Sequence, residues 1–374
     1  MVFVGLISYP LYLWHWPILS FARIVEGEMP SREIRMGAVA LSLVLAWLTY
    51  RLIEKPIRFG KNTWIKTAAL SMALVLVAYV GYNAFKRDGL NFRLDSSKPL
   101  NKIIFVPYPP LKQKFDCGKH IPEFKYFVFD GNCLLSKDEL PTVIFVGDSH
   151  AGQFRNAVFD KFTADAVLHV VQTSCLPFSS DAFLTGECKR KYNAIIEFLE
   201  KNRSVKDVFL SGYWAYLMSG GFDKQGPNWR NAKTLSEEDK LTFKKNASEF
   251  ISRVSATGKR VILLKDIPDL DFDIRLCFDI RPLRITPAKI QHNCSMNEAN
   301  YIQRRASYDL VIDELLLSFP NVVSYNPVPL FCKNGKCAAK DSLLPYYMNG
   351  DHVNHFGASL VINGLIDELA KIRK

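Results

Sequence analysis

The most constraining feature of the chain is the segment VIFVGDSHAGQF, Val143–Phe154, in which an apolar run breaks at a Gly-Asp-Ser-His turn. Val143–Val146 has the continuous β-prone, apolar character of a strand buried in a parallel sheet. Residues 151–162 have the helical spacing of apolar positions, and Gly147 permits a tight turn before them. The sequence therefore predicts that Ser149 lies at a helix N-terminus, beside the carboxyl end of a central strand.

Ser149 has two interpretations in this position. As a helix N-cap it would only accept a hydrogen bond from a backbone N–H group. As a nucleophile it would lie beside N–H groups that can stabilise a developing oxyanion. A second element near the end of the chain, NGDHVNHFGAS at Asn349–Ser359, favours the nucleophile, because His352 has a side chain suited to a general base near neutral pH.

GDSH near the start of a domain, with a D-x-x-H-type element near its end, resembles the SGNH hydrolase superfamily. The resemblance implies that Ser149 is the nucleophile and that His352 is its general base. The family normally has an aspartate that orients the histidine, at the position where this chain has Asn349. An asparagine can hold the imidazole but supplies no negative charge. Asp351 is the other candidate, although neighbouring side chains on an extended segment point apart.

The same resemblance implies oxyanion donors in two further blocks. The second block corresponds to Thr173-Ser174-Cys175, which has no glycine, so the backbone N–H of Ser174 is the expected donor. The third block corresponds to Gly212-Tyr213-Trp214, which has no asparagine. Trp214 is expected either to shape an acyl or sugar pocket or to pack in the core.

Two residues near Ser149 and His352 in the sequence, Asp148 and His355, are expected to have supporting roles. Asp148 is expected to accept backbone hydrogen bonds in the turn rather than act as an acid. His355 lies beyond the motif position, so we expect it at the surface or behind the site rather than as the base. Neither a metal site nor a bound cofactor is expected in this chain.

Three uncharged or nearly uncharged stretches near the N-terminus predict transmembrane helices: Val2–Ala22, Met36–Tyr50 and Thr67–Phe85. Each is close to the roughly 20 residues that cross a bilayer. The first lacks a basic n-region and a cleavage site, which excludes a signal peptide. The basic loop Arg51–Lys66 is predicted to be cytoplasmic, which places everything after the third helix outside.

The eight cysteines all lie between residues 117 and 337. Their even number favours disulfides in an oxidising compartment such as a bacterial periplasm. A zinc site is the alternative, but no clustered Cys/His spacing supports it. Their grouping favours local pairs, which are Cys117–Cys133, Cys175–Cys188, Cys277–Cys294 and Cys332–Cys337.

The membrane segments carry a second resemblance. SYPLYLWHWPIL, Ser8–Leu19, followed by LIEKPIRFG, Leu52–Gly60, is similar to the end of an acyltransferase-3 membrane domain. Many bacterial members of that family carry a periplasmic SGNH domain after an extra linking helix. The resemblance implies a multi-pass protein of the bacterial inner membrane. The helices that handle the acyl donor precede this region in the family, so we expect a truncated or split member, whose membrane domain a separate chain could complete.

The fold class expected is α/β: three transmembrane helices followed by a three-layer α/β/α SGNH-type domain with a mostly parallel sheet. The parts expected are the transmembrane helices in 1–85, a periplasmic linker and extension in 86–140, and the SGNH-type domain in 141–374. The elements predicted after Pro141 are strands at Val143–Val146, Val167–Gln172, Val208–Ser211, Arg260–Leu264 and Val322–Tyr325, and helices at Tyr192–Lys201, Lys240–Thr257 and Asn297–Phe319.

The resemblance implies O-acetyl transfer to a bacterial cell-envelope glycan such as lipopolysaccharide O-antigen, with acetyl-CoA as the donor of the complete enzyme. A carbohydrate esterase or deacetylase would use the same residues with water as the acceptor, and a non-catalytic remnant is the third possibility. The net charge of +11 has no nucleic-acid motif beside it, so no nucleic-acid partner is expected.

Overall fold

The computed structural model of the 374-residue chain describes residues 2–26, 29–60, 63–87, 108–124, 132–172, 175, 178, 186–214, 236–272, 274–278, 294–341 and 344–372. They fall into two compact units. The first unit spans Met1–Asn101 with Phe278–Gln291, and the second spans Lys102–Cys277 with His292–Lys374.

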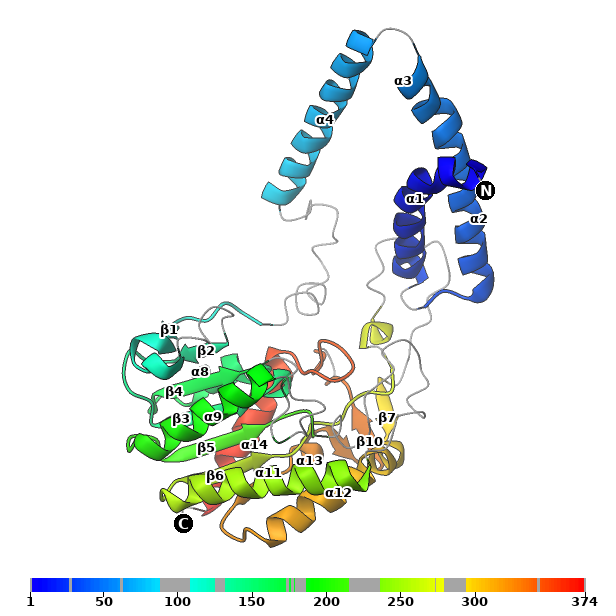
Figure 1. Ribbon diagram of the computed structural model, residues 1–374. Helices are drawn as coiled ribbons and strands as arrows, with labels where there is room; N and C mark the ends of the chain where they lie inside the picture. Colours follow the sequence, from blue (N-terminus) through cyan, green and yellow to red (C-terminus); the bar gives the residue numbers. More distant parts are fainter. Residues whose placement is uncertain are drawn as a thin grey trace. The chain divides into compact units, whose positions relative to one another are not determined.

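The described N-terminal residues of the first unit are mostly helical, in agreement with all three predicted stretches (Figure 1). Two stretches, Arg32–Phe59 and Thr63–Lys86, are long and apolar enough to cross a membrane. The count of three transmembrane helices is therefore not confirmed and stays a prediction. The elements are α1 (Val2–Glu26), α2 (Arg32–Thr49), a π-helical turn η1 (Tyr50–Glu54), α3 (Lys55–Phe59) and α4 (Thr63–Lys86).

The second unit is built on a seven-stranded sheet with the order β1-β2-β4-β3-β5-β6-β8 (Figure 1). The neighbours from β4 to β8 pair in parallel, whereas β1 with β2 and β2 with β4 are antiparallel. The mostly parallel sheet is as predicted. Its strands are β1 (Phe115–Asp116), β2 (Cys133–Leu135), β3 (Val143–Gly147), β4 (Val167–Val171), β5 (Asp207–Ser211), β6 (Arg260–Leu264) and β8 (Val323–Tyr325).

Alternating side chains of the central strands face two layers of helices. Ile144 and Val146 pack in one apolar cluster with residues of α9, α11 and α12. Phe145 points to the other face, where it stacks on Phe209 with ring centroids 4.3 Å apart. The helices of this unit are α7 (Ser149–Gly152), α8 (Arg155–Lys161), α9 (Gly186–Lys201), α11 (Glu237–Ala256), α12 (Glu298–Leu317), α13 (Val328–Phe331) and α14 (His355–Ile372), with short 3-10 turns η3 (Cys117–Lys119), η4 (Pro122–Phe124) and η6 (Ile274–Cys277).

The sheet begins earlier in the chain than the predicted strand alternation, which starts at Pro141. β1 and β2 lie in the stretch predicted as a linker and extension, and they add an antiparallel edge to the sheet. Strands of two and three residues have no detectable periodicity in the sequence. A small second sheet was also not predicted; it consists of β7 (Ser295–Asn297), β9 (Cys332–Lys333) and β10 (Lys336–Ala338).

All four predicted disulfides are present, and each joins cysteines that are neighbours in the sequence. Cys117–Cys133 ties η3 to β2, while Cys332–Cys337 closes the turn between β9 and β10. The other two are Cys175–Cys188 and Cys277–Cys294.

Gly147, the last residue of β3, has no room for a side chain. A Cβ atom there would lie 1.6 Å from the Ser211 carbonyl oxygen and 2.8 Å from the Ala151 Cβ. The glycine therefore allows β3 and β5 to pair closely up to the residue where the chain turns into α7.

Gly147→Ala is expected to lower the free energy of unfolding by about 3 kcal/mol or more, because the backbone of β5 must move. Gly152→Ala is the matched control, since its Cβ would only meet Val171 methyl carbons at 3.4 and 3.8 Å. We expect that control to stay within about 1 kcal/mol of the wild type in urea unfolding. Equal stability of both variants would contradict the close approach.

Candidate active site

The turn that presents Ser149 is organised by a buried carboxyl group. Asp148 is 2% exposed; its Oδ1 accepts from the His150 N–H (2.7 Å) and its Oδ2 from the Tyr213 N–H (2.9 Å). It thus joins the turn after β3 to the turn after β5, and the predicted role as an acceptor of backbone hydrogen bonds is confirmed. Burial raises the pKa of this carboxyl to about 6, although the two N–H donors act in the opposite direction.

A turn near the C-terminus presents His352. Tyr347 and Val353 form an antiparallel bridge, and the Met348 N–H donates to the His352 carbonyl (2.9 Å). Inside this turn the Asn349 Oδ1 accepts from the backbone N–H groups of Asp351 (3.0 Å) and His352 (2.7 Å). The asparagine therefore shapes the turn through its side-chain oxygen.

The two turns bring Ser149, His352 and Asp351 into one line of hydrogen bonds. The His352 Nε2 lies 3.0 Å from the Ser149 Oγ, and the His352 Nδ1 lies 2.8 Å from the Asp351 Oδ1. Since a carboxylate can only accept, the proton of the neutral ring lies on Nδ1 and leaves Nε2 free to accept from the serine hydroxyl.

Asn349 does not occupy the orienting position that the motif implied. Its Nδ2 lies 3.4 Å from the His352 Nδ1, but an amide NH₂ cannot accept from a protonated ring nitrogen. Its oxygen is already used by two backbone N–H groups. Asp351 contacts the histidine instead, because residues 349–351 form a bend rather than the extended segment on which neighbouring side chains diverge.

The electrostatics of the site favour a charged Asp351. Burial alone would raise the pKa of this carboxyl, but the hydrogen bond and charge of His352 lower it below its ordinary value of 3.8. Asp351 is therefore ionised at neutral pH. Its negative charge lies beside the ring that would become an imidazolium during proton transfer.

The uncharged ring of His150 packs against the ring of His352. The two rings have centroids 4.5 Å apart, and His150 stacks on Tyr213 at 4.0 Å. His150 is 2% exposed, and neither ring nitrogen has a hydrogen-bond partner among the described residues. Burial and the nearby His352 hold the pKa of His150 well below 6.5, so it adds no positive charge to the site.

The described residues also include one set of side chains that could hold a metal ion. Potential ligand atoms of His150, Asp351 and His352 lie within 4.8 Å of one another. A cation bound to either nitrogen of His352 would replace its hydrogen bond to Ser149 or to Asp351. Such binding would compete with the Ser–His arrangement.

The remaining predicted site residues lie elsewhere. Ser174 is outside the described residues. His355 begins α14, and its Nε2 lies 3.7 Å from the Asp160 Oδ2 in α8, away from the base position. Trp214 has no exposed surface, and its ring stacks on Phe178, so of its two predicted roles the structure supports packing in the core.

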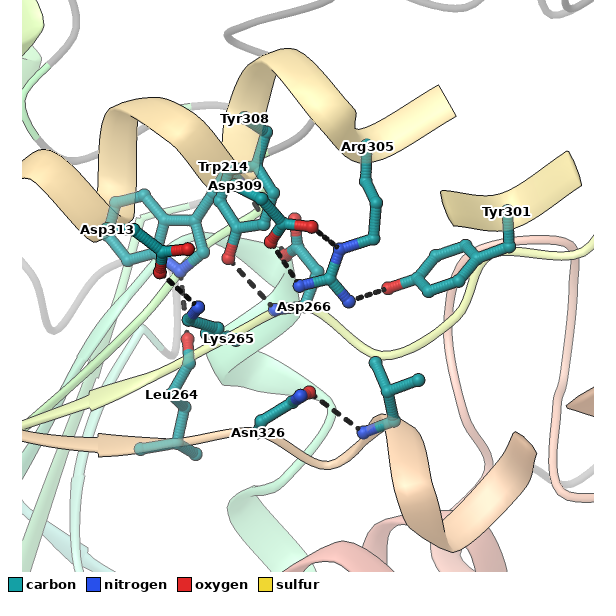
Figure 2. A network of polar contacts seen from close by, with 11 residues as sticks. Trp214, Leu264, Lys265, Asp266, Tyr301, Arg305, Tyr308, Asp309, Asp313 and Asn326 are labelled. Atoms are coloured by element: carbon teal, nitrogen blue, oxygen red, sulfur yellow. Dashed lines mark hydrogen bonds and ion pairs between the residues drawn. The ribbon is translucent and has the colours of Figure 1, made fainter. Parts of the chain in front are cut away.

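Figure 2 shows Trp214 among polar contacts that hold α12 against the ends of β5 and β6. The Trp214 Nε1 donates to the Leu264 carbonyl (2.9 Å), and the Tyr308 hydroxyl lies 3.4 Å from the Asp266 N. The backbone N–H of Trp214 is 3.3 Å from the Asp266 Oδ1. Since the Tyr213 N–H donates to Asp148, the backbone N–H groups of Tyr213 and Trp214 both already have acceptors within the protein.

Three residues near the pair were not assigned a function from the sequence: His150, Gln153 and Tyr213. His150 lies within the GDSH motif. Gln153 follows Ser149 by four positions, a spacing that places Gln153 and Ser149 on the same side of a predicted helix. That spacing was the available signal for Gln153. The contact of His150 with Tyr213 depends on the pairing of β3 with β5, which the motifs alone do not reveal.

Asp148 gives the fold a testable pH dependence. The pKa of its carboxyl is about 6 in the folded protein and near 3.8 when unfolded, so the folded state holds the proton more tightly. The stabilisation is complete below the unfolded pKa and is lost as the pH rises through the folded pKa, and it amounts to roughly 3 kcal/mol. As the pH falls from about 7 to about 4, the wild type should gain stability relative to Asp148→Asn. Urea unfolding over that range measures the difference, and a constant difference would contradict the prediction.

Comparison with known proteins places residues 116–366 in the family described as the SGNH domain (fused to AT3 domains). Over 60 residues the chain is 38% identical to the O-acetyltransferase OatA of Staphylococcus aureus (strain NCTC 8325). This match covers 16% of the chain and 10% of OatA, so the chain spans about a tenth of the length of the curated relatives it matches.

The solved structures to which the chain is similar include the following two. The periplasmic domain of the Salmonella ser. Paratyphi A lipopolysaccharide acetyltransferase is 12% identical, with a TM-score of 0.39, over 61% of this chain and 84% of that domain. A GDSL-like lipase from Bacteroides thetaiotaomicron is 13% identical, with a TM-score of 0.33, over 61% of this chain and 88% of the lipase.

Proposed function

Because the chain belongs to the family of SGNH domains that are fused to AT3 domains, we propose that it transfers an acetyl group to a hydroxyl of a bacterial cell-envelope glycan. One observation carries the proposal: the hydrogen bonds from Ser149 to His352 (3.0 Å) and from His352 to Asp351 (2.8 Å). This is the arrangement that activates a serine hydroxyl as a nucleophile.

The proposed reaction has two steps. In the first, the Ser149 Oγ attacks the carbonyl carbon of the acetyl donor while its proton passes to the His352 Nε2, and the donor's leaving group departs with that proton. In the second, a glycan hydroxyl gives its proton to His352 and attacks the acetyl-serine ester; the bond to the Ser149 Oγ breaks, and this oxygen takes the proton back from His352. Asp351 holds the ring and stabilises its charged form in both steps.

The acyl oxygen needs hydrogen-bond donors as its negative charge develops. We assign the backbone N–H of Ser149 to this role, since it lies at the start of α7 beside the nucleophile. The second donor remains the N–H of Ser174, as the family pattern implies.

The wider setting follows from the same proposal. The name of the Staphylococcus aureus relative supports O-acetyl transfer. We propose lipopolysaccharide O-antigen as the acceptor for a first test. Four disulfides support an oxidising compartment such as the periplasm. The two membrane-length stretches support a location in the bacterial inner membrane. There, acetyl-CoA would supply the acetyl group to the complete enzyme.

A carbohydrate esterase is the second candidate function. Its supporting observation is solvent access, since the side chains of His352 and Asp351 are 17% and 29% exposed. Water could then replace the glycan hydroxyl in the second step, with the same residues in the same roles.

Product analysis separates the two candidates. The full chain in detergent is incubated with p-nitrophenyl acetate, with and without O-antigen polysaccharide, and free acetate and acetylated glycan are measured. Transfer predicts that the polysaccharide diverts acetyl groups from acetate to glycan, and that Ser149→Ala and His352→Ala abolish both products. Acetate as the sole product would support the esterase, and undiminished turnover in Ser149→Ala would contradict both functions.

The third member of the site can be tested separately. Asp351→Asn should lower kcat by about 10³- to 10⁴-fold, because it removes the charge that stabilises the imidazolium. Asn349→Ala should lower kcat by about tenfold or less, because it removes hydrogen bonds to backbone N–H groups only. Initial rates with p-nitrophenyl acetate measure both, and the reverse order of the two effects would restore Asn349 as the orienting residue.

A further inference from the structure

We propose that Gln153 is a positioning residue that holds the base in register with the nucleophile, a role that rests on the proposed function of the Ser149–His352 pair. Its side-chain amide joins the residue after the nucleophile to the residue after the base. The Gln153 Nε2 donates to the His150 carbonyl (2.9 Å), and its Oε1 accepts from the Val353 N–H (2.8 Å).

Gln153 is buried, so the loss of either hydrogen bond would leave its partner without a replacement from water. The residue is 2% exposed and follows directly after α7, so water cannot readily replace either partner. The bond to Val353 connects positions 200 residues apart in the sequence. It therefore ties the helix of the nucleophile to the turn of the base across the interior of the unit.

Among the described residues, three further hydrogen bonds of the base turn go to segments other than that of the nucleophile. The Leu270 N–H donates to the Gly350 carbonyl (2.6 Å), the Tyr347 hydroxyl to the Pro268 carbonyl (2.6 Å), and the Tyr108 hydroxyl to the Val353 carbonyl (3.0 Å). Apart from the bond between Ser149 and His352 themselves, Gln153 supplies the hydrogen bond that links the two segments in the described part of the chain.

The chemistry of the position selects glutamine. A carboxamide can donate with one group and accept with the other, whereas leucine can do neither. Asparagine keeps both groups on a side chain that is one methylene shorter. Loss of the link would let the His352 ring move relative to the Ser149 hydroxyl, and a displacement of about 1 Å in such a pair can lower the rate about 10²-fold.

The test compares Gln153→Leu with Tyr108→Phe in the full chain. Tyr108→Phe is the matched control, since it removes a hydrogen bond to the same residue, Val353, and leaves the hydrogen bonds of Gln153 in place. With p-nitrophenyl acetate we expect Gln153→Leu to lower kcat by about 10²-fold with KM changed less than about threefold, and Tyr108→Phe to lower kcat by less than about threefold. Similar kcat values for Gln153→Leu and the wild type, or an equal loss of kcat in both variants, would overturn the positioning role.

A structural readout keeps the test independent of activity. Crystal structures of the two variants should show the distance between Ser149 Oγ and His352 Nε2 beyond hydrogen-bond range in Gln153→Leu and unchanged in Tyr108→Phe. An unchanged distance in Gln153→Leu would overturn the inference even if the wild type proved inactive, which would refute only the proposed function. If Gln153→Leu does not fold, Gln153→Asn replaces it, with the same expected direction for kcat and for the distance.

Discussion

The site depends on the buried carboxyl group of Asp148, which accepts one backbone N–H from each of two turns. These turns follow β3 and β5, whose close pairing requires Gly147 because any Cβ atom there would collide with the Ser211 carbonyl. The bond to the His150 N–H starts α7 at Ser149, and the bond to the Tyr213 N–H brings the Tyr213 ring against His150. Ser149 is thus held at the carboxyl end of the sheet by hydrogen bonds to the backbone of its neighbours, and its own hydroxyl stays available to His352.

The base comes from the other end of the chain and is fixed by a different device. The side-chain oxygen of Asn349 accepts hydrogen bonds from two backbone N–H groups and so holds the backbone in a bend. This bend turns the Asp351 carboxylate toward the ring of His352. In this chain the residue at the position of the usual aspartate, Asn349, is therefore not the residue that contacts the histidine ring. The carboxylate is supplied by a neighbour of the histidine, and the residue at the motif position supplies the turn.

The sequence was sufficient to predict the parts of the fold that are long or chemically distinctive. The central strands are continuous apolar runs, and the helices between them have clear periodicity. Ser149 and His352 stood out because their motifs are specific, and the four disulfides followed from the grouping of the cysteines. β1 and β2 were not predicted because two or three residues carry no period. The choice between Asn349 and Asp351 as partner of His352 stayed open in the sequence, because the contact of Asp351 with His352 depends on a bend made by Asn349. The choice between a pocket and a core role for Trp214 stayed open because it depends on long-range packing.

The central claim is that Ser149 is a nucleophile activated by His352. The most direct measurement is peptide-resolved mass spectrometry of the full chain, quenched during turnover of p-nitrophenyl acetate. We predict an acetyl group on Ser149 in the wild type and its loss in His352→Ala, with the amount of acetyl-Ser149 decreasing when the acceptor glycan is added. Turnover without acetyl-Ser149 under conditions that trap acyl-enzymes, or equal acetylation of Ser149 in His352→Ala, would contradict it.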